Sequence, residues 1–370
     1  MGLNKNQQVF LEVVKAGLWD RNNLDYNLDL NGVDWGKVYQ LAQEQSIQGL
    51  VLQGIEWVKN HNLNDKVNLN LDIPQILLLQ WIGEVQMIEQ QNKTMNQFVA
   101  ELVEKTRAAD IYAILVKGQG VAQCYEKPLW RPSGDVDLLL SEVNYKKAKE
   151  LLLPLSSSNK NEERYSQHLG MSIGQWYVEI HGSLRTGLSA RVDKEVDAVQ
   201  ESVFIGGNVR SWDNNGTLVF LPASTEDVFL VFTHFIKHFY KEGVGLRQIC
   251  DWCRLMWMYR DSLNYGMLEQ RIKRTGLVSE WKAFYNLASR YLGMPDLGSG
   301  LMVHDSRFDK KADRIMEFIL KSGNMGHNRD MSHFSKYPYL IRKCVSMGRR
   351  IGDLINHARI FQKNIVWSAK

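Results

Sequence analysis

An acidic pair inside an apolar run, at residues 135–140, constrains the fold of this chain more than any other segment. Asp135 and Asp137 are separated by Val136 and followed by three leucines. Side chains of a β-strand alternate between its two faces, so both carboxylates point one way while Val136 and Leu138 point into a core. The segment therefore predicts a strand with one acidic face, on which the carboxylates are roughly 6 to 7 Å apart.

Two carboxylates on one face suit a hard divalent cation such as Mg²⁺, which takes oxygen ligands and shares them with substrate phosphates. An ordinary strand with a solvated outer face would show the same pattern, so Asp135 and Asp137 alone leave both alternatives open. Gly134, directly before the pair, would let a backbone or a phosphate come close.

A β-rich run at residues 111–116 lies upstream and ends at a glycine turn, Lys117-Gly118-Gln119-Gly120, after which a helix can begin at Val121. A strand, a glycine turn and a helix N-terminus form a site for anionic phosphates, because the first N–H groups of the helix are available there. Lys117 would add a positive charge. Many turns need glycine, so this signal gains weight only from the acidic strand that follows it.

Residues 175–181 predict another strand, with Glu179 and His181 on one face and Val178 and Ile180 on the other. If this strand pairs with the acidic strand, Glu179 becomes a third carboxylate of the same metal site. His181 would then contact a phosphate, the acceptor or a neighbouring acid. The alternative is an edge strand whose polar residues face water.

In this order, the segments resemble the DNA polymerase β nucleotidyltransferase superfamily and, within it, an uncharacterised bacterial nucleotidyltransferase family. The resemblance spans roughly residues 30–330, and the matching positions are residues 115–118, Tyr125, residues 131–138 and residues 178–181. That family also carries a His-rich helix followed by a Leu-Arg-x-x-x-Asp segment, which correspond here to residues 234–240 and 246–252.

The resemblance implies a metal-dependent transfer of a nucleoside monophosphate from an NTP to a hydroxyl group. Asp135 and Asp137 would hold two Mg²⁺ or Mn²⁺ ions, and Glu179 would complete the catalytic site. Two metals about 3.5 to 4 Å apart stabilise both the entering and the leaving oxygen of an in-line displacement. The candidates for binding the nucleotide triphosphate are Lys117, Gly118, Gln119, Arg131, Ser133 and Gly134.

The chain departs from the superfamily pattern in three ways. Lys117-Gly118-Gln119-Gly120 stands where Gly-Ser or Gly-Gly is usual, the gap to Asp135 is longer, and the third acid is Glu179 in place of the commoner Asp. These departures favour the alternative of an inactive nucleotide-binding sensor or interaction module on the same fold. A scaffold without any nucleotide role is a third alternative. The base preference and the acceptor, a small molecule, a protein or RNA, are left open.

Composition agrees with a nucleotide-binding protein without requiring one. Of the 370 residues, 44% are hydrophobic, which is enough for a sizeable core. The net charge of +4 is too mild to indicate a nucleic-acid ligand. The polar residues 1–8 carry no secretory signal, and no apolar stretch is long enough for a bilayer, so we expect a cytoplasmic protein with no membrane partner. The four cysteines form no disulfide framework.

Helical spacing of apolar residues predicts helices over 6–18, 34–58, 76–109 and 142–153, and again from Ser224 onward. Residues 156–161 predict a loop, and residues 208–212 and 217–221 a hairpin. We therefore predict an α+β protein in which a small mixed β-sheet forms the nucleotidyltransferase core. The predicted parts are a helical N-terminal lobe over 1–110, the catalytic core over 111–222 and a helical C-terminal lobe over 223–370.

The predicted C-terminal lobe contains residues that could line a cleft on its nucleotide or acceptor side. His234 and His238 lie four residues apart on one helix face, as do Arg247 and Asp251. A polar seam and an intrahelical ion pair are the ordinary explanations, and the resemblance favours a place beside the nucleotide or acceptor. After residue 340 the chain predicts an amphipathic basic helix, with a solvated basic face or a role in guiding an RNA acceptor.

Overall fold

The computed structural model describes residues 2–19, 30–62, 71–159, 162–163, 167–241, 243–298, 300–324 and 360–361. The chain forms two compact units. We call one the helical unit (Met1–Ile82, Thr233–Cys253 and Gly276–Lys370) and the other the sheet unit (Gly83–Phe232 and Arg254–Thr275). The three-part division at residues 110 and 222 stays a prediction, and the basic segment after residue 340 lies almost wholly outside the described residues.

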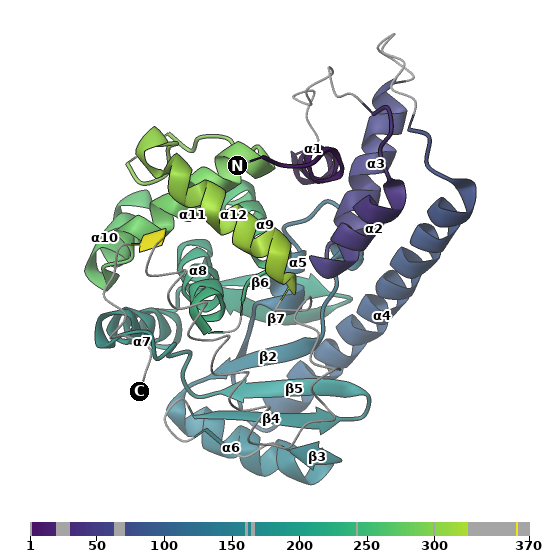
Figure 1. Cartoon of the computed structure of the whole chain (residues 1–370). Coiled ribbons are helices and arrows are strands. Elements are labelled where there is room, and N and C mark those ends of the chain that lie inside the picture. The colour runs from purple at the N-terminus through teal and green to yellow at the C-terminus, as the bar shows by residue number, and fades with distance from the viewer. Residues whose placement is uncertain are drawn as a thin grey trace, which may run out of the picture. The chain divides into compact units, whose positions relative to one another are not determined.

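The sheet unit is built on a five-stranded sheet with the strand order β1-β2-β5-β4-β3 (Figure 1). Strands β2 and β5 are parallel and the other neighbours are antiparallel, so the predicted small mixed sheet and the α+β class are confirmed. The strands are β1 (Ala113–Val116), β2 (Asp135–Leu140), β3 (Ser158–Asn159), β4 (His168–Ile173) and β5 (Trp176–His181).

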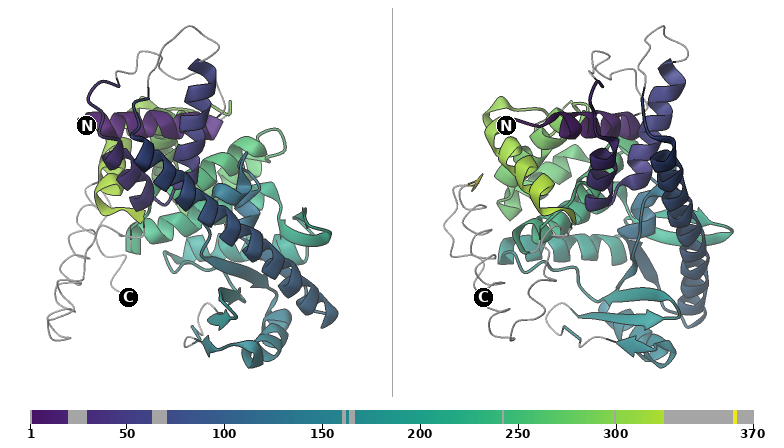
Figure 2. Two further views of the ribbon diagram at one scale, coloured as in Figure 1. Left: turned by 90° about the vertical axis from the view of Figure 1, so that its right-hand side faces the viewer. Right: turned by 45° about the vertical axis from the view of Figure 1, so that its right-hand side comes forward.

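Helices cover the apolar face of this sheet. Val136 and Leu138 of β2 share one core with Val178 of β5, as the alternation of side chains requires. Helices α4 (Gln75–Ala108) and α6 (Glu142–Leu152) supply the apolar side chains packed against them. Figure 2 shows α4 as one continuous long helix. The opposite face is left for the polar residues of β2 and β5.

A separate two-stranded sheet confirms the predicted hairpin. Strands β6 (Val209–Asn214) and β7 (Thr217–Pro222) are joined by Asn215 and Gly216. Both residues have positive φ, 54° and 92°, which is what a tight two-residue hairpin turn demands. Val219 and Leu221 of β7 extend the core of the main sheet.

Several elements differ from the sequence prediction. The helical segment predicted over 34–58 forms two helices, α2 (Trp35–Glu44) and α3 (Gln48–Asn62), because Ser46 between them adopts a positive φ of 54°. Strand β4 and helix α7 (Ala190–Phe204) had not been predicted. The segment predicted as a loop over 156–161 contains the short strand β3, and its last two residues lie outside the described part of the chain.

The remaining described elements are helical. Those not yet named are α1 (Lys5–Trp19), α5 (Gly118–Ala122), α8 (Ser224–Lys241), α9 (Leu246–Met258), α10 (Tyr265–Thr275), α11 (Val278–Leu292) and α12 (Asp309–Ser322), with short 3₁₀ turns at Pro128–Trp130, Leu153–Leu155 and Ser306–Phe308. Among the described residues, no helix has the length and apolar character needed to cross a membrane.

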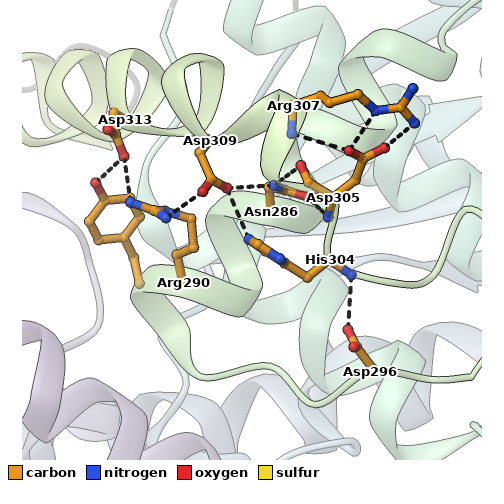
Figure 3. A network of polar contacts seen from close by, with 9 residues as sticks. Asn286, Arg290, Asp296, His304, Asp305, Arg307, Asp309 and Asp313 are labelled. Atoms are coloured by element: carbon orange, nitrogen blue, oxygen red, sulfur yellow. Dashed lines mark hydrogen bonds and ion pairs between the residues drawn. The ribbon is translucent and has the colours of Figure 1, made fainter.

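A polar network ties α11 to α12 in the helical unit (Figure 3). The Asp309 carboxylate accepts hydrogen bonds from Asn286 at 2.8 Å and Arg290 at 2.7 Å, and it lies 2.9 Å from His304 Nε2. Asp296 accepts the backbone N–H of His304 at 3.0 Å. These contacts fix the connection between the two helices.

Candidate active site

The acidic face of the sheet forms because β2 and β5 pair in parallel. In the observed register, Asp137 lies opposite Glu179, and Asp135 lies two residues earlier on the same face as Asp137. The pairing of these two strands, which the sequence prediction required, is confirmed. Asp137 is buried, with 2% of its surface exposed, whereas Asp135 and Glu179 are partly exposed. Three carboxylates of two neighbouring strands therefore belong to one face.

Asp137 is held by two nitrogen donors on a single carboxylate oxygen. Its Oδ1 lies 2.8 Å from Lys117 Nζ and 2.7 Å from His181 Nε2. Burial opposes ionisation of this carboxyl group, but the positive charge of Lys117 and the hydrogen bond from His181 outweigh burial and hold the pKa of Asp137 below its usual range. Asp137 is therefore an anion whose charge is already balanced within the protein.

Lys117 reaches Asp137 from an unusual backbone conformation between β1 and α5. Its φ is 59° and its ψ is −143°, a region that costs a non-glycine residue of order 1 to 3 kcal/mol. Burial favours the neutral amine, but attraction to Asp137, Asp135 and Glu179 outweighs burial and raises the pKa of Lys117. The ammonium group is thus fixed at the edge of the acidic face.

The predicted glycine turn is shorter than expected. Helix α5 begins at Gly118 and not at Val121, so Gly118, Gln119 and Gly120 lie inside its first turn. With five residues, α5 has a small dipole, and the contribution of that dipole to anion binding is correspondingly weak. The charge of Lys117 is the stronger electrostatic feature of this turn.

Glu179 is contacted by two histidines. His168 Nε2 lies 3.1 Å and His181 Nε2 lies 3.6 Å from its Oε2. Burial raises the pKa of Glu179 and the Asp137 charge adds to that effect, but the two histidines outweigh both and lower it. The His168 and His181 rings are stacked, with centroids 4.7 Å apart, because β4 and β5 place the two residues opposite each other. Sequence reasoning missed His168 because it had not predicted β4.

Burial also determines the state of His181. With 7% of its surface exposed, burial lowers its pKa, and the positive charge of Lys117 adds to this against the hydrogen bond and charge of Asp137. His181 is therefore a neutral imidazole at neutral pH, and its Nε2–H donates to Asp137. This neighbouring acid is one of the three contacts that the sequence had left open for His181.

A buried chain of side chains positions the loop before β2. Ser133 Oγ accepts a hydrogen bond from Arg131 at 2.7 Å and donates to Gln119 Oε1 at 3.4 Å. Gln119 in turn donates to Asn92 Oδ1 at 3.2 Å. Asn92 of α4, another residue missed from sequence, donates to the carbonyl oxygens of Leu129 and Arg131, both at 2.8 Å. These contacts give Gln119 and Ser133 a positioning role, and the next residue of the loop, Gly134, is exposed.

Comparison with protein families agrees with this arrangement. The family described as uncharacterised nucleotidyltransferase matches residues 31–293, well over half of the chain. The chain belongs to this nucleotidyltransferase family. No curated protein and no solved structure matches it. The family supports nucleotidyl transfer as the general activity of the protein.

The other residues that the sequence suggested for the site lie in the helical unit. His234 and His238 of α8 are 3.1 Å apart between their Nε2 atoms, with their rings at 71°. Arg247 and Asp251 belong to α9, in the same unit. A place for these four residues beside the acidic face stays a prediction.

The acidic face of the nucleotidyltransferase fits a divalent cation in its donor chemistry. Asp135, Asp137 and Glu179 offer carboxylate oxygens from one face of the sheet, which are the ligands that Mg²⁺ prefers. Lys117 and His181 both contact Oδ1 of Asp137, so Oδ2 is the atom outside these two contacts. Asp135, Asp137 and Glu179 are therefore the residues that would hold such a cation.

Proposed function

We propose that this protein transfers a nucleoside monophosphate from an NTP to a hydroxyl acceptor, with Mg²⁺ or Mn²⁺ held by Asp135, Asp137 and Glu179. One observation carries the proposal. Asp137 and Glu179 are register partners on parallel strands, and Asp135 shares their face. Paired carboxylates on adjacent strands, next to a fixed ammonium group, fit the charge of a metal-bound triphosphate.

The residues of the chain divide the work of this reaction. The acceptor hydroxyl oxygen attacks the α-phosphorus while its proton passes to solvent, the bond from that phosphorus to the bridging oxygen of the β-phosphate breaks, and pyrophosphate leaves with that oxygen. A divalent cation, when bound, stabilises the negative charge on the reacting oxygens and makes the acceptor hydroxyl more acidic. Lys117 offers positive charge to the phosphates, and the exposed Gly134 leaves room for their approach. The Glu179 carboxylate, kept ionised, orients the acceptor hydroxyl.

Calorimetric titration of each of the four NTPs with Mg²⁺ into the full chain tests the site. We expect metal-dependent binding of at least one NTP, and its loss in Asp135→Asn/Asp137→Asn. Glu142→Gln is the matched control, because this acid of the same unit is 70% exposed and pairs only with Lys146 one helical turn away. Absence of binding to the wild type, or unchanged binding in the double variant, would contradict the proposed site.

Pyrophosphate release separates the proposal from the alternative of an inactive sensor. Lys117 and His181 on Asp137 Oδ1 favour that alternative, since they leave Asp137 less able to bridge two ions. A sensor would bind the NTP and metal without releasing pyrophosphate in the presence of pooled hydroxyl acceptors. The acceptor is left open among a small molecule, a protein and RNA. A cytoplasmic location stays a prediction.

A further inference from the structure

Two imidazole nitrogens, from His168 and His181, lie close to the carboxylate oxygen of Glu179. The ligand atoms of His168, Glu179 and His181 all lie within 4.8 Å of one another. His168 comes from β4, whereas Glu179 and His181 are two residues apart on β5. This group contains nitrogen ligands, which Asp135 and Asp137 do not supply, and so differs in chemistry from the carboxylate set described above.

His168 Nε2 is a buried nitrogen that makes no hydrogen bond. It lies 3.1 Å from Glu179 Oε2 without being hydrogen-bonded to it. Buried polar atoms are nearly always satisfied, so a nitrogen in this position points to a partner of another kind. A cation placed between the nitrogen and the carboxylate oxygen would satisfy both.

The spacing of the atoms fits a small four-coordinate ion. Metal–ligand bonds of 2.0 to 2.1 Å in a tetrahedron place neighbouring ligand atoms about 3.3 to 3.4 Å apart. The separations from Glu179 Oε2 are 3.1 Å to His168 Nε2 and 3.6 Å to His181 Nε2, one on either side of that length. Both histidine nitrogens therefore lie about one ligand–ligand spacing away from the Glu179 oxygen.

Two adjustments accompany binding. The stacked rings of His168 and His181 cannot both direct in-plane lone pairs at one point, so one ring must turn. His168 is the freer of the two, since its side chain is 22% exposed against 9% for His181. His181 must also change tautomer, so that the proton leaves Nε2 and one is held on Nδ1 instead, and Lys117 keeps the Asp137 charge balanced when it does.

We propose that His168, Glu179 and His181 bind one zinc-class divalent cation, Zn²⁺ or Co²⁺, with a fourth position open to water. Two histidines and one glutamate are a ligand set suited to such ions, and imidazole ligands select against Mg²⁺. This binding needs neither an NTP nor nucleotidyl transfer. Because Glu179 belongs to both ligand sets, a zinc-class ion and the Mg²⁺ of the proposed reaction compete for it.

Titration of Co²⁺ into the metal-stripped full chain tests the site directly, because four-coordinate Co²⁺ absorbs visible light far more strongly than the six-coordinate ion. We expect one such Co²⁺ per chain, displaced by equimolar Zn²⁺ and retained in a large excess of Mg²⁺. His168→Gln and Glu179→Gln should weaken binding by at least about tenfold to a hundredfold. Thermal unfolding of each variant checks that it is folded.

His304→Gln is the matched control, because His304 also contacts a carboxylate, Asp309 at 2.9 Å, but belongs to no three-ligand group of this kind among the described residues. It should bind Co²⁺ like the wild type. Absorption that persists in folded His168→Gln and Glu179→Gln, a purely six-coordinate spectrum, or loss of the signal in His304→Gln would overturn the assignment. Asp135→Asn separates the two proposals, since it should lose NTP binding and keep the Co²⁺ signal.

Discussion

Lys117 Nζ lies 2.8 Å from Oδ1 of Asp137, and this ion pair joins the turn after β1 to the centre of β2. Asp137 is 2% exposed, and the Lys117 side chain is 20% exposed. The pair is therefore mostly removed from water, where loss of one charge leaves the other without compensation. To make this contact, Lys117 adopts a strained backbone conformation with a positive φ of 59°.

Lys117→Met should destabilise the protein by about 3 kcal/mol, because it leaves the Asp137 carboxylate buried with only His181 as a donor. Chemical denaturation of the purified chain measures this loss. The double variant Lys117→Met/Asp137→Asn should be more stable than Lys117→Met alone, since it removes the stranded charge. Equal stabilities of the single and double variants would show that the carboxylate left without Lys117 carries no penalty, which would contradict this prediction.

Asn92→Ala should loosen the loop that leads into the acidic strand. Asn92 is 1% exposed, and its amide holds the carbonyl oxygens of Leu129 and Arg131. Loss of these two partly buried hydrogen bonds should lower the free energy of unfolding by about 1 to 3 kcal/mol. Limited proteolysis should then cut within residues 127–134 faster than in the wild type.

Asn144→Ala is the control for this variant, because the Asn144 amide makes one longer bond, 3.3 Å, to the Tyr112 carbonyl oxygen in the same unit. It should change the stability by less than half as much. If the two alanine variants unfold at the same denaturant concentration, the bridging role of Asn92 is wrong.

The acidic face of β2 and β5 could be predicted from the sequence because its signal is local. Alternation along one strand fixes the shared face of Asp135 and Asp137, and the same rule places Glu179 with His181. Only the pairing of the two strands needed a further assumption, and that pairing is confirmed. Their catalytic roles stay a proposal.

The contacts that surround those acids could not be predicted, because they depend on packing between distant segments. His168 reaches Glu179 only through the pairing of β4 with β5, which no local pattern specifies, although apolar residues do alternate along β4 at positions 169, 171 and 173. Asn92 looks like an ordinary polar position of a long helix until α4 brings it to the loop at Leu129. Likewise, nothing local marks Lys117 as the residue with a positive φ.

Gly54→Ala tests the close crossing of α1 and α3. A Cβ at Gly54 would lie 2.0 Å from the Val13 carbonyl oxygen, so the two helix backbones must separate to admit it. We expect a loss of about 1 to 3 kcal/mol, as for overpacking. Gly83→Ala in α4 is the matched control, since nothing lies within 4 Å of its Cβ, and it should stabilise the helix by about 0.4 to 1 kcal/mol. If both variants change the unfolding temperature in the same direction, the close crossing of α1 and α3 is contradicted.

Tyr291 gives the helical unit a dependence on alkaline pH. Burial, together with the hydrogen bond and charge of Asp313, raises the pKa of Tyr291 to about 12, against an ordinary value of 10. Asp313 also pairs with Arg290, in the network that joins α11 to α12 (Figure 3). A raised pKa means that the folded state keeps the phenol proton longer than the unfolded state.

The contribution of Tyr291 to stability is therefore complete below about pH 10 and is lost as the pH rises toward about 12. We expect the unfolding free energy of the wild type to fall more steeply across that interval than that of Tyr291→Phe. Denaturation curves at steps of pH, with ultraviolet difference titration of the phenols in both proteins, measure the two quantities together. Parallel stability profiles, or a Tyr291 phenol that ionises near pH 10 in the folded chain, would contradict the role assigned to Asp313.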